Sequence, residues 1–356
     1  MPAARDVDEP VLSVDDLVVE VDTPYGRARP VDEVSFEVAR GETVAIVGES
    51  GCGKTMTALA VLGLLPKPGA RVAGGRIRFV GRDLLGLSGR ELRRIRGSAM
   101  SMIFQEPVSA LNPVFTIGQQ ISDVLRAHDP ALTRPAARRR AVELLADVGV
   151  PGASSRVDEY PNQWSGGMCQ RALIAMAIAN RPELLIADEP TTALDVTIQA
   201  QVLEVLRAAQ RTAGAATLLI THDLGVVAEM ADRVVVMYGG RVVETASAEE
   251  IFSAPRHPYT LGLLTSLPRV DTDLRRLLPI PGQPPQLGRI PVGCSFHPRC
   301  HLRRNRARCV DEDPALAAIR SPGRRTACHF HDEMRDEVTN VAAELGADVT
   351  TAVRGG

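Results

Sequence analysis

The sequence predicts an α/β fold with a mainly parallel sheet, a helical insertion and a small cysteine-rich domain towards its C-terminal end. Strand patterns alternate with helical patterns, a mainly helical stretch interrupts them, and four of the six cysteines fall in one proline-rich segment. Alternating strands and helices are typical of a parallel sheet covered on both faces. The 356 residues, 45% of them hydrophobic, suffice for about two globular domains.

The N-terminal part of the sequence predicts two antiparallel strands, followed by a buried strand, a glycine-rich loop and a helix. Residues 11–21 and 32–39 alternate apolar and polar side chains, as half-buried antiparallel strands do. Glu42–Val47 has the pattern of a short buried strand. A glycine-rich turn follows it, and the apolar-periodic stretch Thr55–Leu65 predicts a helix that ends at Pro66.

The middle of the chain is mainly helical by periodicity, from about Ile117 to Asn180, with prolines between the segments. Beyond it, short apolar runs predict strands separated by helices. The strands are Leu184–Ala187, Thr217–Thr221 and Val234–Met237, and the helices are 196–213 and 224–231. We therefore expect one α/β domain over residues 1–255, with a helical subdomain at about 106–180.

The segment after Pro255 differs from the rest. It is rich in proline and weak in periodicity, which predicts a small second domain over residues 256–330 that is held by something other than a large core. The last residues, 331–356, are expected to form a weakly ordered tail.

Composition excludes several classes of protein. A formal net charge of -2 and only 3% aromatic residues argue against nucleic acid as a partner, because such proteins are usually basic and stack bases on aromatic rings. The apolar runs are too short for a membrane-spanning helix. The N-terminus has no signal-peptide pattern, so we expect a cytoplasmic protein with reduced cysteines.

The strongest motif is Gly48–Thr55 (GESGCGKT), which fits the phosphate-binding pattern G-x-x-x-x-G-K-[ST] after a buried strand and before a helix. Backbone N–H groups of such a loop bind phosphate oxygens. Lys54 is expected to bind the β- and γ-phosphates and Thr55 to bind Mg²⁺. The candidate nucleotide-binding residues are Gly48, Glu49, Ser50, Gly51, Cys52, Gly53, Lys54 and Thr55.

Two carboxylates, Asp188 and Glu189, follow the apolar strand that begins at Leu184. At the C-terminal edge of a parallel sheet they would lie where ligands bind in α/β folds. Asp188 can hold Mg²⁺ and Glu189 can polarise the water that attacks the γ-phosphate. An acidic pair after a strand can also be a helix cap, but the upstream phosphate loop favours a nucleotide site.

A third motif carries a family resemblance. Trp164–Arg171 (WSGGMCQR), followed by an apolar helix, resembles the signature of ATP-binding cassette proteins. The alternative for this motif alone is a serine helix cap. The resemblance implies that Ser165, Gly166 and Gly167 bind the nucleotide of a partner cassette, because two cassettes of this family face head to tail and sandwich two ATP molecules.

Further motifs follow in the family's order over roughly residues 10–255. Gln105 resembles the Q-loop glutamine that senses Mg²⁺ and the transporter, Ala193-Leu194-Asp195 the D-loop, and His222 the switch histidine. The resemblance implies a RecA-like P-loop core with an antiparallel β subdomain. It also implies catalytic roles for Glu189, His222 and Gln105, with Thr55, Gln105 and Asp188 at the Mg²⁺.

The adenine-stacking position departs from the family. Where an aromatic residue is common, before the second strand, this chain has Val21, and Tyr25 is the nearest aromatic residue. We include Tyr25 among the candidate nucleotide-binding residues.

Four other stretches resemble the dipeptide and oligopeptide importer branch, whose pattern nickel importers largely share. They are Gln105–Pro113, His257–Thr260, Ile280–Gly282 with Pro284-Pro285, and Gly293–Cys300. The resemblance implies an ATP-hydrolysing subunit peripheral to the cytoplasmic face of the membrane. Its implied partners are a second ATPase subunit, which we expect to be a related chain, two transmembrane permease subunits and, indirectly, an extracytoplasmic peptide-binding protein. The rival reading is a soluble cassette ATPase of translation or DNA repair.

Four cysteines, Cys294, Cys300, Cys309 and Cys328, are separated by gaps of five, eight and eighteen residues. Such a group in a proline-rich stretch favours a metal site over disulfides in the cytoplasm. No pair has the close spacing of a zinc knuckle. The spacing resembles the [4Fe–4S] ligand set of some peptide-importer ATPases, with zinc and free thiols as alternatives. Cys52 and Cys169 are expected to be incidental.

Overall fold

The computed structural model describes residues 9–24, 26–192, 196–266, 279–319 and 323–345. The chain forms two compact units, each assembled from segments that are far apart in the sequence. The first contains Met1–Ser13, Glu37–Thr43 and Ile77–Ile220, and the second contains Val14–Phe36, Val44–Arg76 and Thr221–Gly356. The division at residue 255 stays a prediction. Within the described ranges, no helix is long and apolar enough to cross a membrane.

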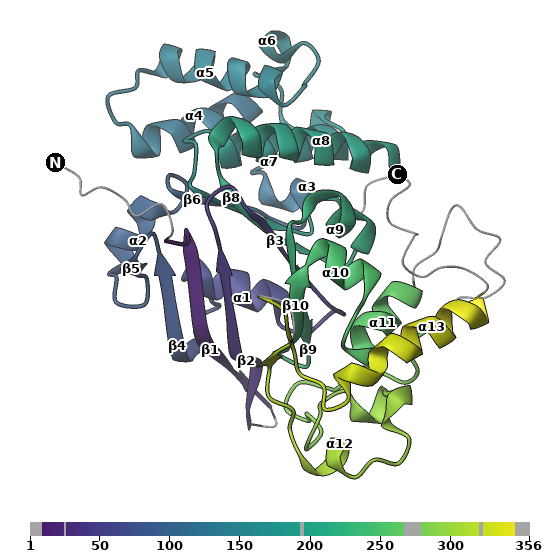
Figure 1. Cartoon of the computed structure of the whole chain (residues 1–356). Helices are drawn as coiled ribbons and strands as arrows, with labels where there is room; N and C mark the ends of the chain where they lie inside the picture. The colour runs from purple at the N-terminus through teal and green to yellow at the C-terminus, as the bar shows by residue number, and fades with distance from the viewer. Residues whose placement is uncertain (1–8, 25, 193–195, 267–278, 320–322, 346–356) are drawn as a thin grey trace. The chain divides into compact units, whose positions relative to one another are not determined.

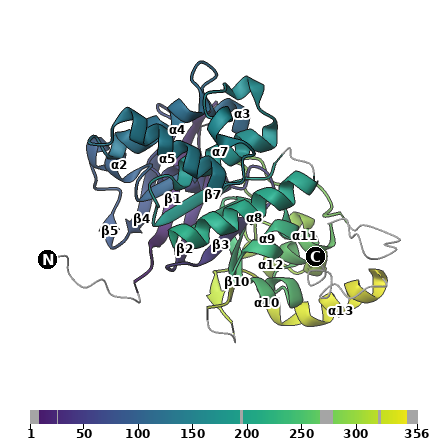
Figure 2. The ribbon, with the colours of Figure 1, turned by 90° about the horizontal axis from the view of Figure 1, so that it is seen from above.

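The first unit contains a parallel sheet and the predicted helical insertion. Strand β7 lies between β6 and β8 and is parallel to both, and all five of its residues are buried. Helices α4, α5 and α7 group together in both views of the ribbon (Figures 1 and 2). The elements are β5 (Arg82–Asp83), α2 (Gly89–Ile95), β6 (Met100–Ile103), α3 (Pro107–Ala110), α4 (Ile117–His128), α5 (Arg134–Asp147), α6 (Ala153–Arg156), η1 (Pro161–Gln163), α7 (Gly166–Ile178), β7 (Leu184–Asp188), α8 (Val196–Ala213) and β8 (Ala216–Thr221).

Local signals explain where the helices of the insertion begin. The side chains of Thr116, Thr133 and Ser165 each accept a hydrogen bond from a backbone N–H in the first turn of the following helix. A cap of this kind is worth about 1 kcal/mol. Apolar residues at helical spacing, such as Ile117 and Ile121 on α4, are fully buried and hold the helices together.

A second sheet has the strand order β2-β1-β4-β5 and is formed by β1 (Leu12–Thr23), β2 (Gly26–Val38), β4 (Ala70–Phe79) and β5. The sequence predicts β1 closely but starts β2 six residues late. Strand β4 was not predicted, because its first residues, which include Gly74 and Gly75, do not alternate regularly between apolar and polar. Only Ile77 and Phe79 of this strand are buried.

In the second unit the strand order is β11-β12-β10-β9-β3. Strand β3 is parallel to β9, whereas β9 and β10 are antiparallel and are joined at Gly239 and Gly240, both with positive φ. Strand β10, which follows this two-residue glycine turn directly, was not predicted from the sequence. The elements are β3 (Thr43–Val47), α1 (Lys54–Val61), α9 (Leu224–Met230), β9 (Arg233–Tyr238), β10 (Arg241–Ser247), α10 (Ala248–Ser253), α11 (Pro258–Thr265), η2 (His297–Arg299), η3 (His301–Arg303), α12 (Arg308–Asp311), β11 (Ala317–Ala318), β12 (Arg325–Thr326), η4 (His331–Glu333) and α13 (Met334–Leu345).

Helix α1 ends four residues before the predicted end at Leu65. Gly63 adopts φ +62 directly after the cap residue Leu62. A left-handed glycine terminates a helix readily because it has no Cβ to clash. The helix therefore stops there even though the apolar residues continue.

Residues 331–356 were expected to form a weakly ordered tail, but Met334–Leu345 form helix α13. Met334 and Val338 of this helix pack on Leu261 of α11 and on Leu302. Figure 1 shows α13, in yellow, beside α11. The sequence did not predict this helix, because its apolar face is short. The residues that this face packs against, Leu261 and Leu302, lie far from it in the sequence.

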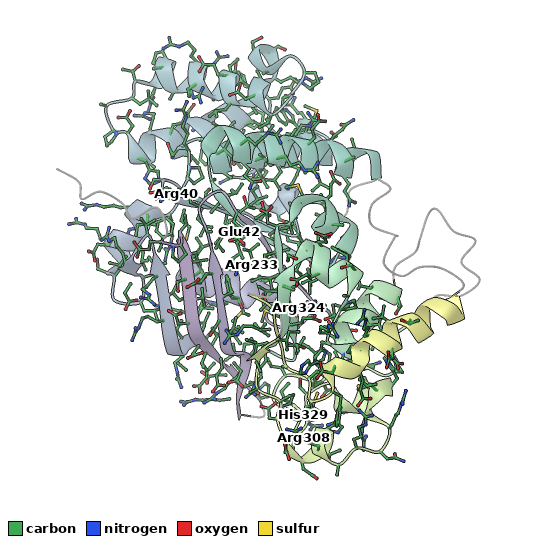
Figure 3. The ribbon with its side chains drawn as sticks, in the orientation of Figure 1. Arg40, Glu42, Arg233, Arg308, Arg324 and His329 are labelled. Atoms are coloured by element: carbon green, nitrogen blue, oxygen red, sulfur yellow. The ribbon has the colours of Figure 1, made fainter. Side chains whose placement is uncertain are left out.

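The C-terminal segment is joined to β10 by a buried ion pair. Glu244 of β10 is fully buried and lies 3.2 Å from Arg324, which Figure 3 labels, and the backbone N–H groups of Arg256 and His257 donate to its two oxygens. Burial raises the pKa of the Glu244 carboxyl, while these donors oppose that shift. The Glu244 carboxylate thus bonds to the segment that precedes α11 and to Arg324.

His257 caps helix α11 and is buried in its neutral form. Its Nδ1 accepts the backbone N–H of Tyr259 at 3.1 Å, and burial lowers the pKa of its imidazole to about 3. The unfolded chain, with a histidine pKa near 6.5, binds a proton first as the pH falls. The contribution of His257 to stability is therefore complete above pH 6.5 and is lost as the pH falls towards 3.

We predict that the free energy of unfolding falls by about 1 kcal/mol between pH 6.5 and 5.5 because of His257. His257→Asn keeps a cap acceptor but removes the titrating ring, so this variant is expected to be less stable at pH 7 and to lose that part of the pH dependence. Urea unfolding of both proteins at several pH values measures the difference between them, which separates His257 from other groups such as Glu244. Parallel pH profiles would contradict the prediction.

Candidate functional site

The phosphate-binding loop lies in the second unit, between β3 and α1, and its first and last glycines sit against neighbouring backbone. A Cβ at Gly48 would lie 2.2 Å from the Met237 carbonyl oxygen of β9, and one at Gly53 would lie 2.1 Å from the Pro30 carbonyl oxygen of β2. No side chain fits at either position. Close packing against neighbouring backbone therefore requires glycine at both of these positions of the motif.

Lys54 is the first residue of α1, and its side chain is only 6% exposed. Its Nζ donates to the carbonyl oxygens of Gly48, at 2.7 Å, and of Glu49, at 3.1 Å. The ammonium group is therefore held inside the loop, next to a helix N-terminus that also favours anions. Thr55, the next residue, is exposed.

In the first unit, two predicted site residues contact each other. Strands β6 and β7 are parallel with Ile103 opposite Ala187, so Gln105 and Glu189 each lie two residues beyond a matched pair. The Gln105 Nε2 donates to the Glu189 Oε2 at 3.1 Å. The register of the two strands brings together side chains that are 84 residues apart in the sequence.

Glu189 is held by its backbone conformation and by several hydrogen bonds. It adopts φ +47, a conformation that is costly for a residue with a side chain and that occurs often at functional sites. Its N–H donates to the Ile220 carbonyl oxygen at 2.7 Å, and its Oε2 accepts a hydrogen bond from the Thr192 hydroxyl at 2.7 Å. Thr192 was not predicted from the sequence as a site residue, although it lies only three residues after Glu189. Asp188, at the end of β7, is 2% exposed.

The signature segment opens helix α7 with accessible backbone. Ser165 caps the helix by accepting the Met168 N–H at 3.4 Å. A Cβ added at Gly166 would meet nothing within 4 Å, so its backbone faces open space, whereas one at Gly167 would lie 2.7 Å from Ile198. Trp164 and Cys169 of this segment are both buried.

The remaining predicted nucleotide-site residues are placed as follows. His222 is exposed and directly follows β8. Tyr25 and the D-loop residues Ala193-Leu194-Asp195 lie outside the described residues. Val21 is half-buried in β1.

All four predicted metal-binding cysteines line one pocket of the second unit, together with Phe296, Phe330 and several other side chains. The Cys294 N–H donates to the Cys309 carbonyl oxygen, and the Nε2 of His329, next to Cys328, lies 3.0 Å from the Glu312 carbonyl oxygen. Glu312 also accepts from Arg308 (both Arg308 and His329 are labelled in Figure 3). The segments that carry the cysteines are therefore bonded to one another.

The thiols of the pocket are shielded from water. Burial raises the pKa of Cys294 to about 11 and those of Cys300 and Cys328 to about 12, and it also raises that of Cys309. Among the described residues, no group of three or more histidine, cysteine or acidic side chains is arranged closely enough to hold a metal ion. The prediction of an iron–sulfur cluster therefore stays a prediction.

The sequence models of two known families match separate segments of the chain. The ABC transporter profile matches residues 31–192, and that of the oligopeptide/dipeptide transporter C-terminal region matches residues 243–309. Among similar proteins, the dipeptide transport ATP-binding protein DppD of Bacillus subtilis (strain 168) is 49% identical over 325 residues, which are 91% of this chain and 96% of that protein. DppD of Escherichia coli (strain K12) is 48% identical over 320 residues, with 90% and 96% covered.

Solved structures show the same fold. A dimeric ATP-binding cassette, MJ0796, in a post-hydrolysis state bound to ADP and Pi superimposes with a TM-score of 0.59 at 26% identity, over 67% of this chain and 98% of that one. The cbiO1 protein of Clostridium perfringens, part of an ABC transporter complex, gives a TM-score of 0.58 over 69% and 91%. The fold and the phosphate loop define a P-loop ATPase. The chain belongs to the ABC transporter family and carries the C-terminal region of its oligopeptide/dipeptide branch, which confirms the predicted resemblance.

Proposed function

We propose that this chain binds and hydrolyses ATP to drive the uptake of dipeptides or oligopeptides through separate permease subunits. The observation that carries the proposal is its similarity over almost the full length to dipeptide transport ATP-binding proteins, which includes the C-terminal region specific to that branch. Nickel or another solute is the alternative cargo, because nickel importers share much of the motif pattern.

The proposed roles follow from the chemistry of each side chain. Lys54 and the loop backbone bind the phosphates, and Thr55, Asp188 and Gln105 serve the Mg²⁺. Glu189 is the base that polarises the attacking water, and Thr192 and Gln105 orient its carboxylate by hydrogen bonds. His222 contacts the γ-phosphate. These assignments combine the family motifs with the local contacts described above.

The proposed assembly is a pair of cassettes beneath two permease subunits at the cytoplasmic face of the membrane, supplied by an extracytoplasmic peptide-binding protein. Ser165, Gly166 and Gly167 would bind the nucleotide of the partner cassette, and the open space at Gly166 supports this role. We expect the partner to be a related chain. A soluble ATPase of translation or repair is the rival, and the net charge of -2 disfavours its binding to nucleic acid.

We predict that Glu189→Gln binds ATP but hydrolyses it about 100-fold or more slowly, because the change removes the base and leaves the phosphate loop intact. Lys54→Ala should instead weaken nucleotide binding, since the ammonium group inside the loop is lost. Nucleotide affinity and ATPase rate of both variants in the assembled transporter distinguish the two effects. A Glu189→Gln rate within a few fold of the unchanged protein would remove Glu189 from the catalytic role.

We predict that the chain, purified from membranes under mild conditions, carries a related ATPase and two permease subunits with it. Mass spectrometry of the co-purified chains is the measurement, and Glu189→Gln serves as a variant that is expected to retain the assembly. Recovery of ribosomes or DNA in place of permeases would contradict the importer function and favour the rival.

We further propose that Cys294, Cys300, Cys309 and Cys328 are the thiolate ligands of a [4Fe–4S] cluster, with zinc as the alternative metal. The support is that all four line one pocket and that thiolates are the usual ligands of such clusters. Binding would lower the pKa of the buried thiols and tie together the segments around α12, so its main contribution would be structural.

We predict that protein purified without oxygen is brown and contains about four irons per chain. Serine at any one of the four positions should lower the iron content. Cys169→Ser is the control, because Cys169 is a buried cysteine of helix α7 that does not line the pocket, and the iron content of this variant should not change. Stoichiometric zinc without visible absorbance, in protein made with ample iron, would identify the wrong choice of metal.

A further inference from the structure

Arg299, just before Cys300, reaches the phosphate loop with all three nitrogen atoms of its guanidinium engaged. Its Nη1 and Nη2 donate to the two carboxylate oxygens of Glu49, at 2.6 and 3.0 Å, and its Nε donates to the Pro281 carbonyl oxygen at 2.9 Å. The side chain is 6% exposed and lies 5.8 Å from the ring centre of Tyr238. Such a planar two-point contact with a carboxylate is specific to arginine.

A second side chain of the C-terminal region holds the same loop residue. The hydroxyl of Tyr259 accepts the backbone N–H of Glu49 at 2.8 Å. Tyr259 is fully buried and packs against Tyr238 and Phe296, with ring centres 4.6 and 5.4 Å apart. Glu49 is therefore fixed both at its main chain and at its side chain by residues more than 200 positions away.

The position of Glu49 matters because of Lys54. The Lys54 ammonium group already bonds to the main-chain oxygen of Glu49. A carboxylate on that same residue, if it were not paired, would compete with phosphate oxygens for the ammonium and would repel them by its charge. The contact with Arg299 neutralises the carboxylate and keeps both of its oxygens occupied.

We propose that Arg299 is a positioning residue of the nucleotide site, which holds the Glu49 carboxylate away from Lys54 and so sets the affinity of the loop for ATP. The inference rests on the proposed nucleotide-binding function. ATP binding would then depend on a residue of the C-terminal region. Arg299 lies in the chain between Phe296 and Cys300, which both line the cysteine pocket.

The test is a double-mutant cycle in the full-length chain, with the Kd for ATP in the presence of Mg²⁺ measured by calorimetry. Arg299→Gln should weaken ATP binding roughly tenfold, because it leaves the Glu49 carboxylate unpaired. Adding Glu49→Gln to this variant should restore most of the lost affinity, since the competing charge is then gone. Glu49→Gln alone completes the cycle.

Rescue separates positioning from a merely structural role. If Arg299 only stabilised the fold, the double variant would bind ATP no better than Arg299→Gln, and this result would overturn the proposal. So would an Arg299→Gln affinity within twofold of the unchanged protein. Arg306→Gln is the matched control: Arg306 forms an ion pair with Glu333 at 2.8 Å and stacks on Phe330 in the same region, and its loss should leave ATP affinity unchanged.

Two further measurements keep the outcome clear. If Arg299→Gln does not fold, Arg299→Lys, which keeps the charge but not the two-point contact, should bind ATP more weakly than the unchanged protein, and equal binding would overturn the proposal. Failure of the unchanged protein itself to bind ATP would overturn the proposed function, whereas normal binding with no effect at Arg299 would overturn this inference alone.

Discussion

The nucleotide site depends on the close approach of the phosphate loop to the strands beside it. Gly48 and Gly53 lie so near the carbonyl groups of Met237 and Pro30 that a Cβ at either position would overlap them. This contact determines where the loop begins and ends, and it places Lys54 at the first turn of α1.

Charge within that loop is balanced by the C-terminal region. Lys54 is bonded to two main-chain oxygens of the loop, and the one carboxylate of the loop, on Glu49, is paired with Arg299. The sequence motif by itself includes only residues of the loop. The ion pair and the Tyr259 hydrogen bond show instead that the small C-terminal region, which carries the cysteine pocket, is part of the loop's immediate surroundings.

In the first unit, the register of strands β6 and β7 determines the position of the Glu189 carboxylate. Because β6 and β7 are parallel and matched at Ile103 and Ala187, Gln105 and Glu189 meet without any further element to bring them together. Thr192 then orients the same carboxylate from the turn that follows. The hydrogen bonds and the left-handed backbone conformation of Glu189 hold this side chain in place.

The sequence by itself determined the elements whose signals are local: the phosphate loop after β3, the acidic pair after β7, and the mainly helical stretch that contains α4, α5 and α7. It did not reveal β4, whose exposed residues have no clear period, nor β10, nor α13. Only the tertiary structure decided that Arg299 and Tyr259 hold Glu49, across 250 and 210 residues of chain. Local spacing encodes which backbone conformation a segment favours, but a contact between distant side chains depends on how all the intervening elements pack, and no short pattern records that.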